Sequence, residues 1–556
     1  MNNKRTRREV LRWGLAGSLT ACAAPNATTT APQPTGNPAT GGSSKTGGPT
    51  SPARPGLQAA DLPAYAPSAH FPEGILSGDP LPSGVVLWTR PSAALLASGA
   101  AITAELARDA SFAAIDAAAT RTPDPAVKGS TKFMIDGLAP NTAYAYRFRI
   151  GEQVSPIGLT RTAPQPDDNV DELTVAVFSC QRWTHGYFTA HADMAAQAPD
   201  LVLCLGDYVY NTGAADGVTV PGRDDPIQDA TSLDDFRGKY EHYRSDVNLQ
   251  AMHARSPLIA VPDNHDGAPL ADDSMYPGAH QAFFEKMPVR TDPNDPLGTH
   301  RRFTWGRLLD VWMLDLQRFA TPGKRGSGNT DGDLDMMDPD VTYLGDQQRR
   351  WLFDGLADTK AVWQVIGSTK QFSPLRIRAG DGSKALNDGT YVNLDQWDGY
   401  QAERLRLLDE VARLGRTGTV AVSGDMHWFW AAEVPRNIDD PNSPAIMTDF
   451  LCGGISSSNA DERIGGGTAG PQTKTLLGAF GPANPHARYF DGDRHGYGLF
   501  RFRSDGADVE YRSPASIREP NAATEVVASF RLDPMKPGIK LVEAVGWDPA
   551  TGRPKP

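Results

Sequence analysis

From residue 173 onward the chain alternates short apolar runs with stretches of helical periodicity, and this alternation constrains the fold more than any other feature. The apolar runs, each the length of a buried strand, occupy residues 173–178, 201–205, 258–261, 309–314, 362–366 and 419–422. Apolar residues recur about every 3.6 positions, which predicts helices, at residues 187–198, 347–356 and 401–414. Strands alternating with helices indicate an α/β fold, in which functional side chains lie where strands end in loops.

Four of the apolar runs are followed at once by side chains that can bind a metal ion. Cys180 follows the first run, and Asp207 and Tyr210 follow the second. The other candidates follow the runs at 258–261 and 419–422, and they are Asp263, Asn264, His265, Asp266, Asp425 and His427. Each fragment alone is weak evidence, because a buried cysteine usually only packs and Gly-Asp after a strand is usually a turn. Since strand ends converge in a layered α/β fold, the four together predict one shared metal site.

Residues 70–165 are rich in β-strand signals. An apolar strand at 85–89 follows a turn at 78–80, and residues 137–149 alternate apolar and polar side chains after a second turn. The second stretch resembles the tyrosine-corner strand of fibronectin type III sandwiches. We therefore expect five segments: a signal at 1–24, a Pro/Thr/Gly/Ser-rich tether at 25–69, a small all-β fibronectin/Ig-like domain at 70–165, an α/β domain with the predicted metal site at 171–530 and a C-terminal tail at 531–556.

The first 24 residues have the layout of an export signal, with a basic start and a short apolar stretch. Residues 6–11 resemble the twin-arginine signal, which would make the twin-arginine export machinery a partner. Residues 19–22 resemble a bacterial lipobox, in which Cys22 would carry a lipid and hold the protein to a membrane. The alternative is a cleaved signal in which Cys22 is incidental. Either way we expect a protein of the bacterial cell envelope, periplasmic or membrane-anchored.

Charge and cysteine content exclude several classes of function. Lys and Arg number 54 against 66 Asp and Glu, a net charge of −12, so the surface repels phosphate backbones and we expect no nucleic-acid partner. The 4 cysteines are too few for a disulfide framework in a chain of 556 residues. Beyond the N-terminus, no apolar run is long enough to cross a membrane.

The order of the motifs resembles one branch of the metallophosphoesterases, the PhoD-type alkaline phosphatases and phosphodiesterases. The matching motifs are Ser179-Cys180, Gly206-Asp207-x-x-Tyr210, Asp263-Asn264-His265-Asp266 and Gly424-Asp425-x-His427. Further similarity lies at residues 78–80, 343–347 and 395–400, so the resemblance covers nearly the whole exported chain. It implies a metallophosphoesterase-type β-sandwich flanked by helices, and a phosphoric ester hydrolase.

The resemblance also implies a role for each candidate residue. It implies a ferric ion, Fe³⁺, held by Cys180, Tyr210 and His427. Asp207 would bridge to a second metal, calcium (Ca²⁺), with Asn264 and Asp425 as further ligands. A metal-bound hydroxide would attack phosphorus, and His265 would protonate or stabilise the leaving oxygen. Asp266 would either orient His265 or serve as an outer-shell ligand.

Four departures from the family pattern affect the expected site. Asp263-Asn264 stands where the family usually has two aspartates, and the asparagine usual near residues 267–270 is missing. At 314–320 the arginines are lost or shifted, which leaves Asp315 and Arg318, with Asp263 and Asp266, as candidates for outer-shell or substrate contacts. At 367–371 a side-chain amide is replaced by Thr369, or its task falls to Lys370.

The expected function is hydrolysis of a small phosphoester, either a diester or a monoester. Because the lipid tether would place the site near a membrane, the first alternative is a phospholipase-D-like phosphodiesterase acting on lipid headgroups. The altered arginines motivate a second alternative, a non-catalytic lipoprotein that binds phosphoesters. The retained ligand residues argue against the second alternative.

Overall fold

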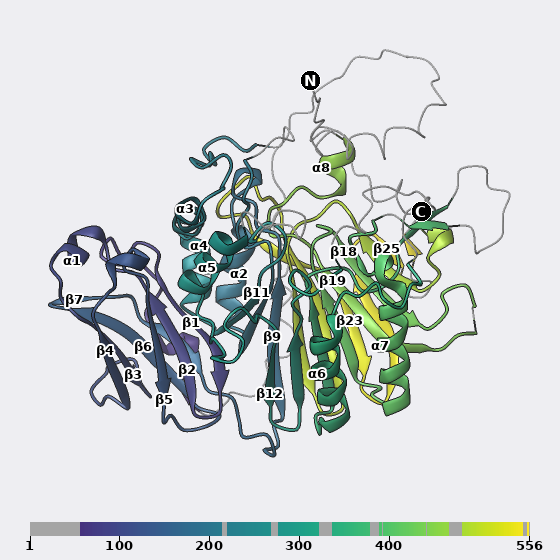
Figure 1. The fold of residues 1–556 in the computed structure, drawn as a ribbon, viewed down its shortest axis with the longest axis horizontal. Coiled ribbons are helices and arrows are strands. Elements are labelled where there is room, and N and C mark those ends of the chain that lie inside the picture. Colours follow the sequence, from purple (N-terminus) through teal and green to yellow (C-terminus); the bar gives the residue numbers. More distant parts are fainter. Residues whose placement is uncertain are drawn as a thin grey trace, which may run out of the picture. The chain divides into compact units, whose positions relative to one another are not determined.

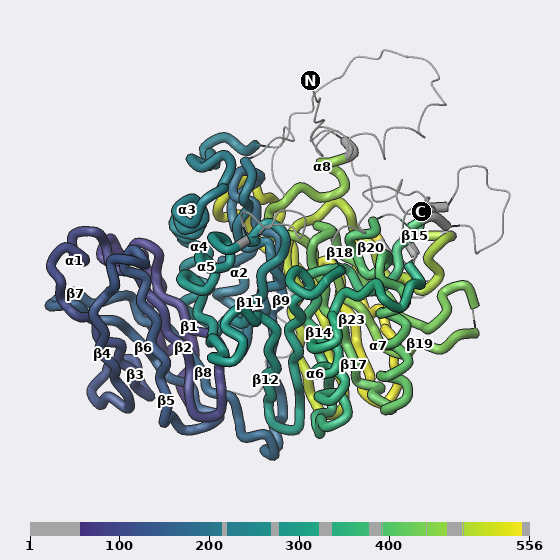
Figure 2. The backbone as a smooth tube through the Cα atoms, in the orientation of Figure 1, coloured from purple at the N-terminus to yellow at the C-terminus, as the bar shows by residue number. Residues whose placement is uncertain are grey.

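The computed structural model describes residues 56–213, 219–267, 276–321, 336–378, 389–391, 393–440, 442–465, 481–548 and 553–554 (Figures 1 and 2). The expected signal, Cys22, most of the tether, residues 268–270 and the end of the C-terminal tail lie outside this part. Within the described residues, no helix has the length and apolar character needed to cross a membrane.

Two large sheets form the centre of the fold. The first has ten strands in the order β24 (Lys536–Ala544), β23 (Thr524–Asp533), β22 (Gly506–Pro514), β21 (Tyr497–Arg503), β9 (Glu172–Phe178), β10 (Leu201–Leu205), β11 (Leu258–Val261), β1 (Ile75–Leu81), β2 (Gly84–Thr89) and β5 (Thr131–Asp136). The second has seven strands in the order β12 (Arg301–Trp305), β13 (Leu309–Met313), β14 (Trp363–Ser368), β17 (Thr419–Ser423), β19 (Ala445–Cys452), β18 (Phe429–Pro435) and β20 (Ala487–Asp491). The neighbours β9, β10 and β11 are parallel, as are β13, β14, β17 and β19.

Strand periodicity explains how each sheet buries both faces. In β10, Leu201, Leu203 and Leu205 join the core that also contains residues of the seven-stranded sheet. Val202 and Cys204 join a different core, formed with the helices on the outer face. Alternate residues of a strand point to opposite faces, so a continuous apolar run is what a sheet covered on both sides requires.

Helices cover the outer face of each sheet (Figure 1). On the ten-stranded sheet these are α2 (Thr189–Gln197), α3 (Leu233–Tyr243), α4 (Val247–His253) and α5 (Tyr276–Lys286). On the seven-stranded sheet they are α6 (Gly345–Asp358) and α7 (Gln401–Leu414). The shorter helices are α1 (Ala93–Ala97) and α8 (Ala460–Gly465). The α/β fold class, a β-sandwich flanked by helices, is thus confirmed.

The N-terminal strands form a second, smaller sandwich that shares a sheet with the first. Its own sheet contains β4 (Ala117–Arg121), β3 (Ile102–Ala107), β6 (Ala143–Ile150) and β7 (Gln153–Val154), with β8 (Gly158–Arg161) paired to β6. The facing strands β1, β2 and β5 continue the ten-stranded sheet, because β1 pairs in parallel with β11. At this junction a Cβ on Gly78 would lie 2.5 Å from the carbonyl oxygen of Leu258, so only glycine allows the contact. The expected tyrosine corner is present, since Ala139 N–H donates to Tyr144 Oη at 3.0 Å.

The expected boundary at residue 530 needs correction. Residue 530 lies inside β23, and β24 pairs with β23 as the edge strand of the ten-stranded sheet. The first part of the expected tail is therefore integral to the sandwich, because Leu541 and Ala544 pack in its core. Two short antiparallel pairs complete the fold, β15 (Arg376–Arg378) with β16 (Gly389–Tyr391), and β25 (Trp547–Asp548) with β26 (Arg553–Pro554).

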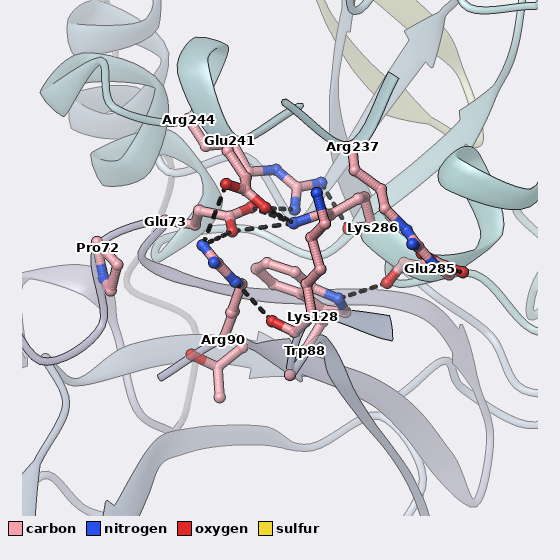
Figure 3. A network of polar contacts seen from close by, with 12 residues as sticks. Pro72, Glu73, Trp88, Arg90, Lys128, Arg237, Glu241, Arg244, Glu285 and Lys286 are labelled. Carbon is pink, nitrogen blue, oxygen red and sulfur yellow. Dashed lines mark hydrogen bonds and ion pairs between the residues drawn. The ribbon is translucent and has the colours of Figure 1, made fainter. Parts of the chain in front are cut away.

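A buried charge network ties the N-terminal strands to the helices (Figure 3). Glu73, just before β1, lies 3.0 Å from both Arg90 Nη1 and Lys286 Nζ, and 3.7 Å from Arg244 Nη1. The guanidinium of Arg244 also lies 4.4 Å above the ring of Trp88. Burial alone would raise the pKa of Glu73, but Lys286, Arg244 and Arg90 outweigh it and hold the pKa below its usual value.

We expect Glu73→Gln to lower the free energy of unfolding by about 3–5 kcal/mol, because it leaves two buried cations without their shared counterion. Since the folded-state pKa is lowered, this contribution is present at neutral pH and lost as the pH falls below about 4.5. Urea titrations of the wild type and the variant, at neutral pH and below pH 4.5, measure this contribution to the free energy of unfolding. Glu241→Gln is the matched control, because Glu241 contacts Lys286 at 3.2 Å but is 30% exposed. Equal losses in the two variants would contradict this expectation.

Candidate metal centre

The predicted ligand residues come together at the carboxyl ends of strands from both large sheets. Cys180 follows β9, Asp207 and Tyr210 follow β10, and residues 263–266 follow β11, all in the ten-stranded sheet. Lys370 follows β14, and Asp425 and His427 follow β17, in the seven-stranded sheet. Because the sheets are packed face to face, their loops meet at one end of the sandwich. Gly206 makes room there, since a Cβ on it would lie 2.3 Å from Asp263 Cβ.

A first ligand group consists of Cys180, Asp207 and His427, whose ligand atoms all lie within 4.8 Å of one another. All three side chains are buried. Cys180 Sγ lies 3.8 Å from Asp207 Oδ2, and Tyr210 Oη lies 3.2 Å from His427 Nε2. The phenol oxygen of Tyr210 is therefore a fourth possible metal ligand beside Cys180, Asp207 and His427.

The backbone is strained at the ligand positions. Positive φ angles occur at Cys180 (58°), Asp207 (52°), Asp425 (74°) and His427 (65°). Residues other than glycine rarely adopt this conformation, and it persists mainly where function requires a particular side-chain direction. Four of the nine described non-glycine residues with positive φ are thus candidate ligands at strand ends, which fits a functional role for them.

The first ligand group fits a metal ion. His427 Nδ1 lies 2.9 Å from the carbonyl oxygen of Ser458 and 2.7 Å from Nη2 of Arg463, so Nε2, 3.2 Å from Tyr210 Oη, is the ring nitrogen left for a metal. Burial and the carboxylate of Asp207 raise the pKa of Cys180 and the pKa of Tyr210 well above their usual values. Without a cation both groups therefore hold their protons, and a strongly charged cation is needed for them to bind as thiolate and phenolate.

A second ligand group, Asp207, Asp263 and Asp425, shares Asp207 with the first. Here an ammonium already lies among the oxygens. Lys370 Nζ is 2.9 Å from Asp263 Oδ2 and 2.8 Å from Asn264 Oδ1, and it also donates to Asp425 Oδ1. The first ligand group offers its donor atoms to a metal ion. In the second group, by contrast, the Lys370 ammonium contacts Asn264 and Asp425, the residues expected to hold calcium, so this group does not fit a second metal ion in the same way.

His265 is held by three neighbours. Its Nδ1 lies 2.8 Å from Asn211 Oδ1, and its ring stacks on that of Tyr210 with centroids 4.2 Å apart. Its backbone N–H donates to Asp207 Oδ1 at 3.1 Å. Burial, together with the charges of Arg182 and Lys370, lowers the pKa of His265 to about 3, so the ring is neutral at neutral pH. With Asn211 Oδ1 accepting, Nδ1 carries the proton and Nε2 is an acceptor.

The structure gives Asp266 a task that the sequence did not indicate. Its Oδ1 accepts the N–H of Val209 at 2.9 Å and its Oδ2 accepts the N–H of Asp263 at 3.1 Å. It thus joins the loops after β10 and β11, and the partner of the His265 ring is Asn211 instead. Asp266 is a positioning residue for the two loops.

Asp315 and Arg318 also take structural roles. Asp315 accepts the backbone N–H groups of Gln317 at 3.1 Å and Arg318 at 3.0 Å, which stabilises the turn after β13. Arg318 Nη1 contacts both carboxylate oxygens of Asp295, at 2.6 and 2.8 Å. The side chain of this loop that reaches the ligand groups is Gln317, which donates to Asp263 Oδ1.

Sequence reasoning missed several residues that contact the ligands. Three are amides: Asn211 contacts His265, Gln317 donates to Asp263, and Gln396 donates to Asp425 at 2.7 Å. Two are arginines: the guanidinium of Arg182 lies 5.1 Å above the Tyr210 ring, and that of Arg463 lies 2.7 Å from His427 Nδ1. Amides and arginines are common in loops, so their residue types alone gave no signal, although Asn211 directly follows Tyr210 and Gln317 directly precedes Arg318.

Two groups of side chains that could hold metal ions thus lie at one end of the packed sheets, and comparison with known proteins gives the family. The model of the PhoD-like phosphatase family matches residues 175–511, and that of the PhoD-like phosphatase N-terminal domain matches residues 56–164. Alkaline phosphatase D of Bacillus subtilis (strain 168) is 32% identical over 500 residues, which cover 85% of this chain and 82% of that protein. A solved structure described as "Structure of PhoD" superposes with a TM-score of 0.76 at 30% identity, covering 87% of this chain and 94% of that one.

The chain therefore belongs to the PhoD-like phosphatase family and is a phosphoric ester hydrolase. The family resemblance inferred from the four strand-end motifs is confirmed, and with it the metallophosphoesterase-type fold. The two ligand groups are places where such an enzyme could hold metal ions.

Proposed function

We propose that this chain is an exported phosphoesterase that hydrolyses phosphodiesters, phosphomonoesters or both at the Cys180–Asp207–His427 group. The observation that carries the proposal is this buried group, completed by Tyr210, at the meeting point of the two sheets. A thiolate, a phenolate, a carboxylate and an imidazole are a donor set suited to Fe³⁺. The bound ion would supply positive charge that acidifies water and offsets charge on the phosphoryl oxygens.

The chain's own side chains would position the reacting groups. Asp207 fixes the His265 loop by accepting its backbone N–H at 3.1 Å. Asn211 fixes the tautomer of His265, and the lowered pKa keeps the ring neutral. His265 would therefore present Nε2 as a hydrogen-bond acceptor to water or substrate. The role that the family resemblance implies for it, protonating or stabilising the leaving oxygen, stays a prediction.

The proposed activity is tested with a chromogenic phosphodiester and the corresponding monoester, assayed side by side on the purified chain loaded with iron. We expect turnover of at least one. Faster diester cleavage would direct the search to lipid or polymer diesters, and release of headgroups from phospholipid vesicles would then identify the phospholipase-D-like alternative. Absence of turnover on both substrates and on vesicles would contradict the proposal.

Export and lipid anchoring are proposed from residues 1–24 and 25–69 alone. We expect the whole chain, made in a bacterium fed a labelled fatty acid, to carry the label, and Cys22→Ser to lose it. Arg7→Lys with Arg8→Lys should retain the protein inside the cell, since these residues would be the arginine pair that the export machinery recognises. Label in neither protein, with a shortened N-terminus in both, would instead indicate a cleaved signal.

A further inference from the structure

The side chain of Lys370 occupies the place where the family resemblance expects a second metal ion. It follows β14, is buried, and its ammonium contacts Asp263, Asn264 and Asp425. These include both of the residues, Asn264 and Asp425, that the resemblance assigns to calcium beside Asp207. The lysine stands within residues 367–371, where this chain departs from the family pattern.

We propose that the ammonium of Lys370 is a built-in second cation, so that this enzyme takes one metal ion and no calcium beside it. The proposal rests on the proposed function for the first ion. A lysine ammonium has three N–H donors, and three oxygens from three residues lie around this one. The charge it supplies offsets the carboxylates of Asp207, Asp263 and Asp425, whose oxygens lie within 4.8 Å of one another.

The oxygens around Lys370 are already engaged, which leaves few for a metal. Asp263 Oδ1 accepts from Thr369 Oγ1 at 3.0 Å and from Gln317. Asp425 Oδ2 accepts from Gln396 Nε2 at 2.7 Å. Calcium needs about six to eight oxygen ligands at roughly 2.3–2.6 Å, and a divalent ion beside an ammonium would also be repelled.

The backbone holds the lysine in this position. Ser368 Oγ donates to the carbonyl oxygen of Lys370 at 2.6 Å, and the indole of Trp397 donates to the same Ser368 Oγ at 3.0 Å. The chain segment that carries the ammonium is thus fixed by buried hydrogen bonds. Unlike a bound ion, the charge of Lys370 cannot be removed by a chelator.

Calcium binding, measured without any substrate, tests the proposal. Isothermal titration of the iron-loaded wild type with Ca²⁺ up to about 1 mM, the weak end of protein calcium sites, should show no ion bound at this group. Lys370→Met removes the charge at similar side-chain length, and we expect it to bind about one Ca²⁺ per chain and to rise in melting temperature when Ca²⁺ is added. Lys360→Met is the matched control, since Lys360 is 68% exposed, and it should behave as the wild type.

Two results would overturn the proposal. The first is calcium bound by the wild type and lost in Asp263→Asn, which would place the ion beside the lysine. The second is absence of calcium binding in both the wild type and Lys370→Met. If Lys370→Met does not fold, calcium titration of the wild type and of Asp263→Asn still tests whether calcium binds beside the lysine. Because none of these measurements depends on turnover, an enzyme inactive on every phosphoester would refute the proposed function and leave this test intact.

Discussion

Asp207→Asn is expected to lower kcat by about 10³-fold or more on any phosphoester the enzyme accepts. Asp207 belongs to both ligand groups, with Cys180 and His427 on one side and Asp263 and Asp425 on the other. Asparagine keeps the shape and can still accept the His265 N–H, but it removes the charge that binds a cation. Steady-state kinetics with metal analysis of the same samples measure both losses.

The fold of Asp207→Asn should survive. In the metal-free protein burial raises the pKa of Asp207 to about 6; Lys370 opposes this shift and Asp425 adds to it. A raised carboxyl pKa means that the metal-free folded state loses stability as the pH rises from about 4 to about 6, and the asparagine variant lacks this loss. We therefore expect an equal or higher melting temperature for the metal-free variant at neutral pH.

Near-normal turnover of Asp207→Asn would contradict the first expectation, because it would show that Asp207 is not a ligand shared by the two groups.

Tyr210→Phe should remove the visible absorption that a phenolate–Fe³⁺ pair gives, and weaken iron binding by about 100-fold or more. The substitution deletes one oxygen, which lies 3.2 Å from His427 Nε2, and keeps the ring on which His265 stacks. Absorption spectra and iron content of the purified variant report these changes directly.

Tyr208→Phe is the control for that experiment. It deletes the buried phenol oxygen two residues earlier, which contacts His253 Nε2 at 2.8 Å and accepts from Arg244 at 3.1 Å, away from the ligand groups. We expect a loss of about 1–3 kcal/mol in stability and an unchanged spectrum. If the absorption stays in Tyr210→Phe, or is lost in both variants, Tyr210 is not an iron ligand.

Most of the central fold could be read from the sequence, because a strand buried on both faces leaves an uninterrupted apolar run. The runs at 201–205 and 258–261 match β10 and β11, and the helical pattern at 401–414 matches α7. The junction of β1 with β11 could not be foreseen, because it depends on the register of two strands far apart in the chain. The end of the sandwich was also placed too early, since β24 is an edge strand with four of its nine residues exposed to solvent.

The candidate ligands could be predicted because each stands directly after a strand, where the sheet fixes its position. Residues such as Asn211 and Gln317 could not, because their contacts depend on loop conformation and their types are common. Lys370 was recognised only through a departure with two readings, in which either Thr369 replaces a side-chain amide or Lys370 takes over its task. In the structure both side chains contact Asp263, Thr369 Oγ1 at 3.0 Å and Lys370 Nζ at 2.9 Å, and Lys370 also contacts Asn264.

Separate family models match residues 56–164 and 175–511, but the ten-stranded sheet runs through both stretches and joins them into one structural unit. Cutting between them would leave the edge of β11 without its neighbour β1, and Lys286 and Arg244 without Glu73. A change at β1 or at Glu73 is therefore expected to need a matching change at β11 or at Lys286 and Arg244, so the two stretches would have to vary together.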